Sequence, residues 1–493
     1  MSRIDEEYLI RIKKLDQLRQ AGIDPYPPRT SRRQSIDYIV RSFDQFLGTG
    51  KPLTIPGRIK SIRAHGGSTF VTITDDSGSI QGYLKKDTMN AGQYDLFSTT
   101  VDIGDFISLT GTPFTTKRGE KTILATDYSM LSKSLLPLPE KWHGLSDVEI
   151  RYRKRYLDLI SNEGIKDIFR KRALLIKTLR SVVEAEGFME VDTPVLQSIP
   201  GGATARPFIT HHNALDADLY LRIAPELYLK RLIVGGFEKV YEIARCFRNE
   251  GIDRDHNPEF TQIEMYAAYW DYAQMMKFTE TIITSIVQAL HGTLTITTHN
   301  QEINFTAPYH ITKFRDAIKH NAKVDIDTAS DDDLRKALTA RAVSFDPKSN
   351  RAKLMDELFK ETVRKNTIDP TFIIEYPIEL SPLAKKCSGN ERYVERFQLL
   401  AGRTELCNAF TELNDPIDQR ARFANQEEMR AAGDDEAQRI DEDFIEALSH
   451  GMPPTAGIGI GIDRLVALLT DSQNLKEVIL FPTLKPVTDH DAD

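Results

Sequence analysis

Apolar and polar residues alternate on both sides of a polar loop between residues 240 and 271. The stretch opens with VYEIAR, whose period of two is typical of a strand. A run rich in Gly, Asp, Asn and Pro follows between Arg248 and Glu259 and indicates a loop. An extended, half-apolar pattern then resumes at Phe260. We therefore predict two strands joined by a loop, with arginines where the first strand ends.

Shorter alternating runs, separated by glycines, fill residues 53–131. They read LTIPGRIKSIRA, STFVTITDD, GSIQGYLKK, DFISLTGTPFTT and GEKTILATDYSML. Five short strands in one compact segment predict a small closed barrel of the OB type. Barrels of this type commonly bind single-stranded nucleic acid by stacking bases on aromatic side chains.

Helical periodicity flanks this barrel. Residues 4–21 carry apolar side chains three and four apart, and Gly22 and PYPP end the pattern. Residues 165–187 form a longer amphipathic pattern that leads into the extended stretch FMEVDTPVL. The first helix has basic side chains, which are either a solvated face or a contact for a polyanion: Lys13, Lys14 and Arg19.

Glycines alternate in GIGIGID, directly before an apolar helical pattern that ends near residue 469. Alternate glycines clear one face of a strand, so that a flat ligand can lie on the backbone. Arg464 falls in the first turn of the helix, where a cation opposes the helix dipole. This placement suggests a use for Arg464 beyond stability.

The composition fits a globular protein of two or three domains. The chain has 493 residues, of which 40% are hydrophobic and 28% are charged. No apolar run reaches the roughly 18–20 residues of a membrane helix, and the charged N-terminus lacks the apolar core of a signal peptide. Three cysteines without paired spacing indicate neither a disulfide framework nor a zinc site. We expect a cytoplasmic protein with no membrane partner.

The net charge of −8 argues mildly against a nucleic-acid partner. The charge is uneven, however, because residues 1–63 carry more basic than acidic side chains. An acidic protein with a basic N-terminal face can bind RNA. Composition alone leaves this question open.

Arg245 and Arg248 give the predicted hairpin rigid sets of donors suited to phosphate or carboxylate. The residues around them supply an acceptor, a switchable cation, a ring and an anion: Glu250, His256, Phe260 and Glu264. Taken alone, the run also fits a hairpin whose charges are simply solvated.

The segment FRNEG…HNPEFTQIEMY resembles the second signature motif of class II aminoacyl-tRNA synthetases, in the form used by lysyl-tRNA synthetases. The helix–strand–Pro arrangement that ends at Pro194 is similar to the first motif, which builds the dimer interface in that family. GIGIGIDR is similar to the third. The resemblance runs from Pro25 to Pro486 and implies an α+β fold. An N-terminal five-stranded OB-type β-barrel would precede a class II catalytic domain, an antiparallel sheet flanked by helices.

The resemblance also implies an organisation into segments. We expect an N-terminal helical extension at 1–50, an anticodon-binding OB-fold domain at 51–134, a linker at 135–164 and a catalytic domain at 165–493. A small helical insertion is expected near 271–370. The basic helix of the linker would pack against RNA or against a partner subunit.

The implied reaction is the activation of L-lysine with ATP, followed by transfer of lysine to tRNA(Lys), in a homodimer. Arg248 and Arg464 are the expected catalytic residues. The expected ATP site has seven members: Arg248, Glu250, His256, Asn257, Phe260, Glu405 and Arg464. In this scheme Phe260 stacks on adenine, Glu250 reads its amino edge, and His256 and Arg464 hold the outer phosphates.

The lysine site that the resemblance implies has eight members: Gly202, Glu226, Arg248, Glu264, Tyr266, Asn408, Phe410 and Glu412. Glu226 and the backbone of Gly202 would hold the α-ammonium group, although Glu226 also fits simple pairing with a helix dipole. Glu264, Tyr266 and Glu412 would accept the ε-ammonium group. Related aspartate enzymes need a cation there instead, which favours lysine over aspartate or asparagine.

Up to three Mg²⁺ ions with ATP are expected from the family. Glu405 is the expected ligand, Gln398 stands where the family usually has a glutamate, and Glu412 is a further candidate. An amide oxygen brings no charge, and hard cations favour carboxylates. Glu405 and Glu412 are seven residues apart, an odd spacing that separates them on a strand unless a bulge intervenes. We expect them to serve different roles.

The barrel would read the anticodon through Phe70, Gln81 and Glu120, with Arg58 and Arg63 as further anticodon-binding residues. As a bare pattern, Phe70 also fits a core position. Two other functions remain open: an enzyme that transfers activated lysine to a protein, and a catalytically silent RNA-binding protein on the same fold. Paralogues of the first kind lack the N-terminal barrel, and the second would lack adenylation.

Overall fold

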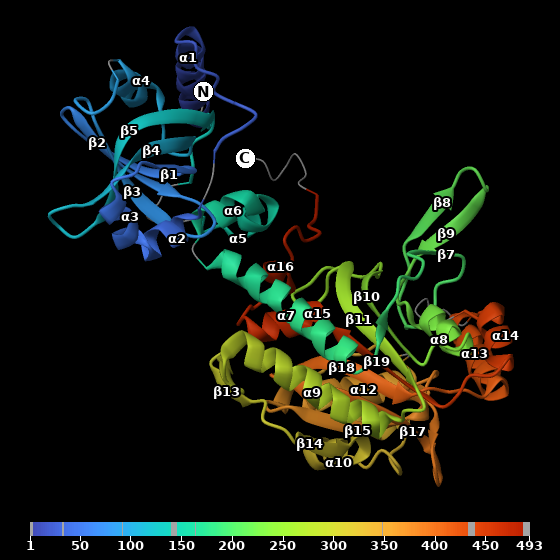
Figure 1. Cartoon of the computed structure of the whole chain (residues 1–493). Coiled ribbons are helices and arrows are strands. Elements are labelled where there is room, and N and C mark those ends of the chain that lie inside the picture. Colours follow the sequence, from blue (N-terminus) through green and yellow to red (C-terminus); the bar gives the residue numbers. More distant parts are fainter. Residues whose placement is uncertain are drawn as a thin grey trace. The chain divides into compact units, whose positions relative to one another are not determined.

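The computed structural model describes residues 3–31, 34–90, 92–139, 145–162, 164–347, 349–431 and 439–486. The chain divides into two compact units, Met1–Ser146 and Asp147–Asp493, which are described separately below (Figure 1). Positions 140–144 and 163 of the predicted linker, and the last seven residues of the predicted catalytic domain, lie outside the described residues.

Five strands of the first unit close into a barrel in the order β1-β2-β3-β5-β4. They are β1 (Leu53–His65), β2 (Ser68–Thr74), β3 (Ser79–Lys85), β4 (Phe106–Thr115) and β5 (Lys121–Ser132). Alternate residues such as Ile59, Val71 and Ile107 fill the interior, as the period of two requires. The predicted OB-type barrel is confirmed.

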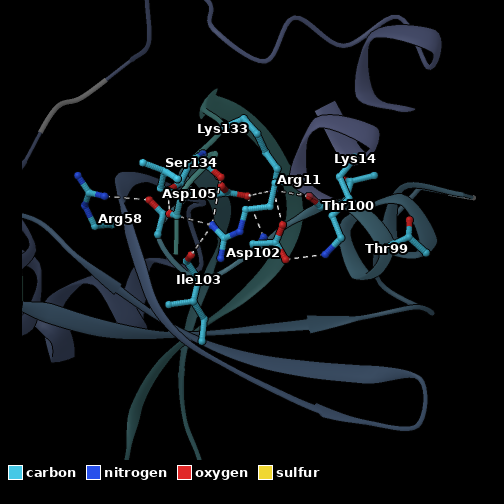
Figure 2. A network of polar contacts seen from close by, with 12 residues as sticks. Arg11, Lys14, Arg58, Thr99, Thr100, Asp102, Ile103, Asp105, Lys133 and Ser134 are labelled. Carbon is cyan, nitrogen blue, oxygen red and sulfur yellow. Dashed lines mark hydrogen bonds and ion pairs between the residues drawn. The ribbon is translucent and has the colours of Figure 1, made fainter. Parts of the chain in front are cut away.

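Four helices pack on this barrel: α1 (Arg3–Gln20), α2 (Ile36–Arg41) and α3 (Phe43–Thr49) before its first strand, and α4 (Gln93–Thr100) between β3 and β4. Figure 2 shows the polar network that fastens α1. The buried Lys133 ammonium lies 2.8 Å from Asp105 and 2.6 Å from Asp102, and Lys14 of α1 also reaches Asp102 at 2.6 Å. Arg11 donates to the carbonyls of Ile103 and Ser134. Lys14, predicted to be solvated or to touch a polyanion, therefore pairs within the protein.

The second unit begins with three helices, α5 (Val148–Arg153), α6 (Arg155–Ser161) and α7 (Ile165–Ala185). Arg155 is fully buried and donates to the carbonyls of Lys476 and Leu480 near the other end of the unit. It also bonds Asp158 at 2.6 Å. This basic residue of the predicted linker therefore serves packing inside the unit.

In the described part of the second unit, nine strands form one sheet, ordered β14-β15-β17-β18-β19-β11-β10-β6 with β16 beside β17. They are β6 (Met189–Glu190), β10 (Lys239–Phe247), β11 (Glu259–Ala268), β14 (His310–Lys313), β15 (Thr371–Pro377), β16 (Lys386–Cys387), β17 (Asn390–Ala401), β18 (Thr404–Thr411) and β19 (Thr455–Gly461). The central pairs are antiparallel as predicted, whereas β6 and β14 pair in parallel at the two edges.

One face of this sheet packs on helices α7, α9 (Tyr272–His291) and α15 (Ile462–Leu469) (Figure 1). On β11 the odd-numbered Ile263, Met265 and Ala267 belong to that core. Because side chains alternate along a strand, the even-numbered residues face the opposite way. Helices α7, α9 and α15 thus leave the other face of the central strands open for a site.

The region 271–370 contributes directly to the main fold. Helix α9 buries its apolar face in the central core, and β14 is an edge strand of the sheet. A hairpin of β12 (Thr295–Thr298) and β13 (Gln301–Asn304) follows α9. Helices α10 (Phe314–Ala322), α11 (Asp331–Thr339) and α12 (Arg351–Thr362) build a second apolar cluster, which packs on β15 and β17. The predicted insertion is thus smaller than its range suggested.

The remaining elements surround the free face. A small sheet contains β7 (Leu196–Gln197), β8 (Ile209–His212) and β9 (Ala217–Leu221). Helices α8 (Glu226–Val234), α13 (Pro416–Ala431) and α14 (Glu442–Ser449) share another apolar cluster, and α16 (Leu475–Val478) follows α15. None of the helices within the described ranges is both long and apolar enough to cross a membrane.

Candidate functional site

A cavity of about 370 Å³ lies on the free face of the large sheet. Its floor comes from β11, β18 and β19, and its walls from α8, the β10–β11 loop and the first turn of α15. Every residue predicted for the ATP and lysine sites lines it. The segments that the sequence patterns singled out therefore converge on one place.

Five residues of strand β11 line the cavity, and four of them alternate along the strand: Phe260, Gln262, Glu264 and Tyr266. Gln262 Nε2 donates to Glu264 Oε1 at 2.6 Å, and the Tyr266 hydroxyl donates to Glu264 Oε2 at 3.0 Å. Glu264 is buried, with 5% of its surface exposed. Burial raises the pKa of Glu264 to about 8, with a further contribution from the charge of Glu226. An acid at this position needs a cationic ligand to hold it ionised at neutral pH.

Arg248 follows β10 and places its guanidinium over the ring of Phe260, 4.9 Å from the centroid. Its backbone N–H donates to the Pro258 carbonyl at 2.8 Å, which fixes the mouth of the loop. The buried Nε of Arg248 has no hydrogen-bond partner among the described residues. A cation stacked on a ring with an unused donor is suited to an anionic ligand.

The β10–β11 loop carries the other predicted nucleotide contacts. Glu250 and His256 are exposed at the cavity edge, and the Nδ1 of His256 lies 2.9 Å from an Asp253 carboxylate oxygen. Asn257 is buried and donates to the Glu259 carbonyl. Its Oδ1 has no partner among the described residues. Asn257 thus braces the loop as well as lining the cavity.

Helix α8 adds a buried ion-pair cluster that the sequence analysis missed. Lys230 Nζ lies 2.5 Å from Glu226 Oε1, one helical turn away, and also contacts Glu412 Oε2. Lys230 and Glu412 are both 0% exposed. Burial lowers the pKa of Lys230, but the charges of Glu226 and Glu412 outweigh it and hold that pKa above its ordinary value. The Glu226-x₃-Lys230 spacing was the signal available in the sequence.

Two glycines allow this cluster to approach the sheet. A Cβ on Gly457 of β19 would come 2.1 Å from Glu412 Oε1 and 2.4 Å from the Tyr266 ring. Gly202 has φ +85°, and a Cβ there would lie 2.8 Å from the Cβ of Glu226. Gly459 and Gly461 remain open toward the cavity. The glycine alternation therefore serves the acidic cluster at Gly457 as well as a flat ligand further along.

Glu405 and Glu412 both line the cavity, although their spacing is odd. Leu399 of β17 pairs with Cys407, and the next residue, Leu400, pairs with Glu405. Leu406 is the extra residue of a bulge, which restores Glu405 to the face of Asn408, Phe410 and Glu412. The odd spacing favoured opposite faces of the strand for the two glutamates. That prediction is wrong because the bulge intervenes.

Gln398 stands apart from the cavity lining. Its buried Oε1 accepts a hydrogen bond from the Tyr376 hydroxyl at 2.9 Å. Burial keeps the pKa of Tyr376 far above its ordinary value, so this phenol remains a donor. The geometry therefore speaks against Gln398 as a metal ligand. Glu412 is likewise engaged with Lys230. Of the three predicted metal ligands this leaves Glu405, which is partly exposed, lines the cavity and lies 3.7 Å from Arg364.

Arg464 lies in the first turn of α15, where its guanidinium has no hydrogen bond to any described residue and lines the cavity. Its neighbour Asp463 anchors the helix, because it accepts from the Thr261 backbone at 2.8 Å and pairs with Arg172 at 2.5 Å. Among the described residues no group of three or more His, Cys, Asp and Glu side chains is spaced to hold a metal ion.

Three of the residues predicted to bind the anticodon share an outer face of the barrel: Arg63, Phe70 and Gln81. Phe70 of β2 lies opposite Arg63 of β1 and Tyr83 of β3, with ring centroids of Phe70 and Tyr83 4.4 Å apart. Gln81 lies two residues from Tyr83 on the same face, where its Oε1 accepts from Thr122. Phe70 is half-buried rather than a core residue. Arg58 differs, since it donates to the Gly104 carbonyl and stacks on Phe106. Glu120 is exposed in the β4–β5 turn.

Further residues at both sites were not predicted. Phe114 lies 6.1 Å from Tyr83 and extends the aromatic row on the barrel. In the cavity, Arg396 donates to Asn408 at 2.7 Å and stacks over Tyr376. Gln262 supports Glu264, and its even spacing from Phe260 and Glu264 would have revealed it.

Comparisons with known proteins agree with this geometry. Residues 147–485 match the family model of tRNA synthetases class II (D, K and N), and residues 53–131 match the OB-fold nucleic acid binding domain. The lysine–tRNA ligase of Syntrophomonas wolfei subsp. wolfei is 49% identical over 484 residues, covering 98% of each chain. That of Fervidobacterium nodosum is 49% identical, covering 98% of this chain and 95% of the relative. That of Thermotoga maritima is 48% identical, covering 97% and 95%. The chain belongs to the lysine–tRNA ligase family of class II tRNA synthetases.

Proposed function

We propose that this chain joins L-lysine to tRNA(Lys). It activates lysine with ATP to lysyl-adenylate and pyrophosphate, and then transfers the lysyl group to the 3′ end of the tRNA. The observation that carries the proposal is the buried acidic end of the cavity beside Arg248. Glu264, Tyr266 and Glu412 form a closed set of acceptors there, and Glu412 Oε1 has no hydrogen-bond partner among the described residues.

The lysine side chain extends into this acidic end, with its ε-ammonium group against Glu412 Oε1, Glu264 and Tyr266. Glu226 and the backbone at Gly202 hold the α-ammonium group, and Asn408 and Phe410 line the wall. Arg248 takes the carboxylate. A neutral or acidic side chain would leave these buried carboxylates unpaired, which a polar site rejects by about 10⁴-fold or more.

ATP occupies the wider part of the cavity, along Gly459 and Gly461. Adenine stacks on Phe260, on the opposite side from Arg248, and Glu250 accepts from its amino group. His256 and Arg464 hold the outer phosphates, while Asn257 keeps the loop in position. The unpaired guanidinium of Arg464 suits that role because a phosphate would be its first anionic partner.

The carboxylate of lysine attacks the α-phosphorus, the bond to the β-phosphate breaks, and pyrophosphate leaves. Arg248 contacts both the carboxylate and the α-phosphate, so it aligns the two reactants and stabilises the charge that develops between them. Arg464 stabilises the departing pyrophosphate. Positioning and electrostatics therefore supply most of the catalysis, as is general for phosphoryl chemistry.

Magnesium fits the cavity through Glu405. Mg²⁺ is commonly held by one or two carboxylates together with substrate phosphates and water. Glu405 is a partly exposed carboxylate that lines the cavity, and Gln398 is engaged with Tyr376. One protein-held Mg²⁺, with any further ion held by phosphates alone, is the arrangement these residues favour. When bound, the ion neutralises phosphate charge.

The tRNA partner engages the outer face of the barrel. Phe70 stacks on a base of the anticodon, Gln81 and Glu120 read base edges, and Arg63 contacts the backbone. Arg58 supports this face indirectly through its bond to Gly104. We also propose that the enzyme works as a homodimer in the cytoplasm.

Lysine-dependent ATP–pyrophosphate exchange tests the proposal, with aspartate and asparagine as controls. We expect exchange with lysine alone, followed by charging of tRNA(Lys). Exchange without tRNA charging would favour transfer of lysine to a protein. A folded chain that exchanges with no amino acid would favour the silent RNA-binding role.

A further inference from the structure

Lys230 occupies an ammonium-binding site made by the protein itself. Its Nζ contacts the carboxylates of Glu226 and Glu412 and lies 5.4 to 6.0 Å from the ring centroids of Tyr266, Phe410 and Phe444. Two carboxylates and three rings around a fully buried cation form a complete cage. The chain thus places its own ammonium group next to the position where the ε-ammonium group of the substrate lysine is expected to bind.

The Glu412 carboxylate separates these two ammonium positions. Its Oε2 contacts Lys230, while its Oε1 lies against Gly457 and has no hydrogen-bond partner among the described residues. A buried carboxylate without a cation would take up a proton instead of remaining charged. Burial raises the pKa of Glu412 well above its ordinary value, and the Lys230 contact opposes this shift. The contact therefore stabilises the ionised form of Glu412 and holds its other oxygen toward the cavity.

The charges at the acidic end of the cavity support this arrangement. Fully ionised Glu226, Glu264 and Glu412 carry three negative charges, and Lys230 and Arg248 carry two positive charges. Free lysine, with two ammonium groups and one carboxylate, brings one positive charge and makes the set neutral. Without Lys230, the same set would need two positive charges. The built-in ammonium thus matches the cavity to a monocation.

Resting on the proposed function, we infer that Lys230 is a positioning residue for lysine selection. It acts through Glu412, whose ionised form it stabilises and whose carboxylate it orients for the substrate's ε-ammonium group, and through Glu226 on the α-ammonium side. It touches neither the phosphates nor the reacting carboxylate. Its influence should consequently appear in lysine recognition and not in the chemical step.

The test compares lysine with 6-hydroxynorleucine, an isostere that carries a hydroxyl in place of the ε-ammonium group. In ATP–pyrophosphate exchange, we expect Lys230→Met to raise the KM for lysine about 100-fold, with the kcat and the KM for ATP changed less than about threefold. The kcat/KM ratio of lysine to 6-hydroxynorleucine should fall at least about tenfold. A lower KM for lysine would overturn the inference, because it would mean that Lys230 merely repels the substrate.

Matched variants separate this role from general stability. Arg231 lies next to Lys230 on α8, outside the cavity, and pairs with Asp441 and Asp443. Arg231→Met removes these ion pairs and should leave the kcat/KM ratio of lysine to 6-hydroxynorleucine unchanged. If Lys230→Met does not fold, the double variant Lys230→Met with Glu226→Gln replaces it in the same measurement, because it removes one buried charge of each sign. The loss of the Glu226 charge affects the binding of lysine and 6-hydroxynorleucine equally, because both carry the α-ammonium group. A wild-type kcat/KM ratio in this double variant would therefore also overturn the inference.

The wild-type chain distinguishes this inference from the proposed function. Lysine-dependent exchange in the wild type with an unchanged ratio in Lys230→Met overturns only the role of Lys230. A wild-type chain without lysine-dependent exchange overturns the proposed function, and the role of Lys230 with it.

Discussion

Glu412 Oε1 lies so close to the backbone of Gly457 that a Cβ there would approach it to 2.1 Å. The carboxylate is fully buried and cannot withdraw without losing Lys230. We expect Gly457→Ala to weaken lysine binding at least about 100-fold, since overpacking costs about 1–3 kcal/mol and the ion pair is displaced as well. Isothermal titration with lysine alone measures this. Gly459→Ala is the matched control, because its Cβ would meet the nearest atom, Glu264 Cγ, at 3.7 Å. Equal losses in both variants would contradict the assignment.

Lysine binding should release a proton from Glu264. Its pKa is about 8 in the ligand-free site, mainly because of burial, so the carboxyl is protonated at neutral pH. Bound lysine favours the ionised form, and the affinity should therefore rise with pH up to about 8, by at most about tenfold per pH unit. Calorimetry at pH 7 in buffers of different ionisation enthalpy should detect close to one proton released. Burial also raises the pKa values of Glu226 and Glu412, so in Glu264→Gln the release should fall. An unchanged release would assign the proton to one of these two groups.

Magnesium dependence should distinguish Glu405 from Gln398. We expect Glu405→Gln to raise the magnesium concentration for half-maximal exchange about tenfold, because a carboxylate ligand is lost. Gln398→Leu should leave that concentration unchanged and destabilise the fold by about 1–3 kcal/mol, since the Tyr376 hydroxyl loses its buried acceptor. Magnesium titrations of exchange, together with urea unfolding, measure both. A raised magnesium requirement in Gln398→Leu would return Gln398 to the list of ligands.

Phe70→Leu should affect tRNA and leave amino-acid activation intact. Loss of one stacked base costs about 1–3 kcal/mol, so the kcat/KM for tRNA charging should fall about 10- to 100-fold. Exchange without tRNA is the internal control and should keep its wild-type rate. A wild-type charging rate would mean that the half-buried Phe70 serves only to support Tyr83.

Lys133→Met should destabilise the barrel unit by about 3–5 kcal/mol, because it leaves Asp102 and Asp105 without their buried cation. Chemical unfolding followed by near-UV circular dichroism measures the change. Lys86→Met removes an exposed pair with Asp95 and should cost at most about 1 kcal/mol. Similar losses in the two variants would show that the network of Figure 2 adds little to stability.

Local patterns predicted much of this fold. The period of two located the barrel strands and both strands beside the loop at Arg248, because each of these strands buries one face. The same periodicity placed Glu264 and Tyr266 together. It did not place Glu405 and Glu412 on the same cavity, since a bulge at Leu406 is a feature of strand pairing and leaves no local signature.

The positions of Gln398 and Lys230 also could not be predicted from local sequence patterns. Gln398 was assigned by resemblance, and only the packing of Tyr376 reveals where its amide is engaged. Lys230 was overlooked because a lysine in an amphipathic helix usually reaches solvent. Its burial depends on Glu412, which is 182 positions away in the sequence. Long-range pairing of this kind follows from tertiary structure alone.

The network around Lys133 has a consequence for where the chain can be shortened. Helix α1 lies outside the barrel strands, yet its Arg11 and Lys14 complete the bonding of the loop around Asp102 and of the carbonyls at Ile103 and Ser134. Removing residues 1–50 would take away the Lys14 ammonium that pairs with Asp102 and the Arg11 guanidinium that bonds the carbonyls of Ile103 and Ser134. A minimal anticodon-binding fragment should therefore start at α1, because a cut placed at the first strand would leave this loop without both partners.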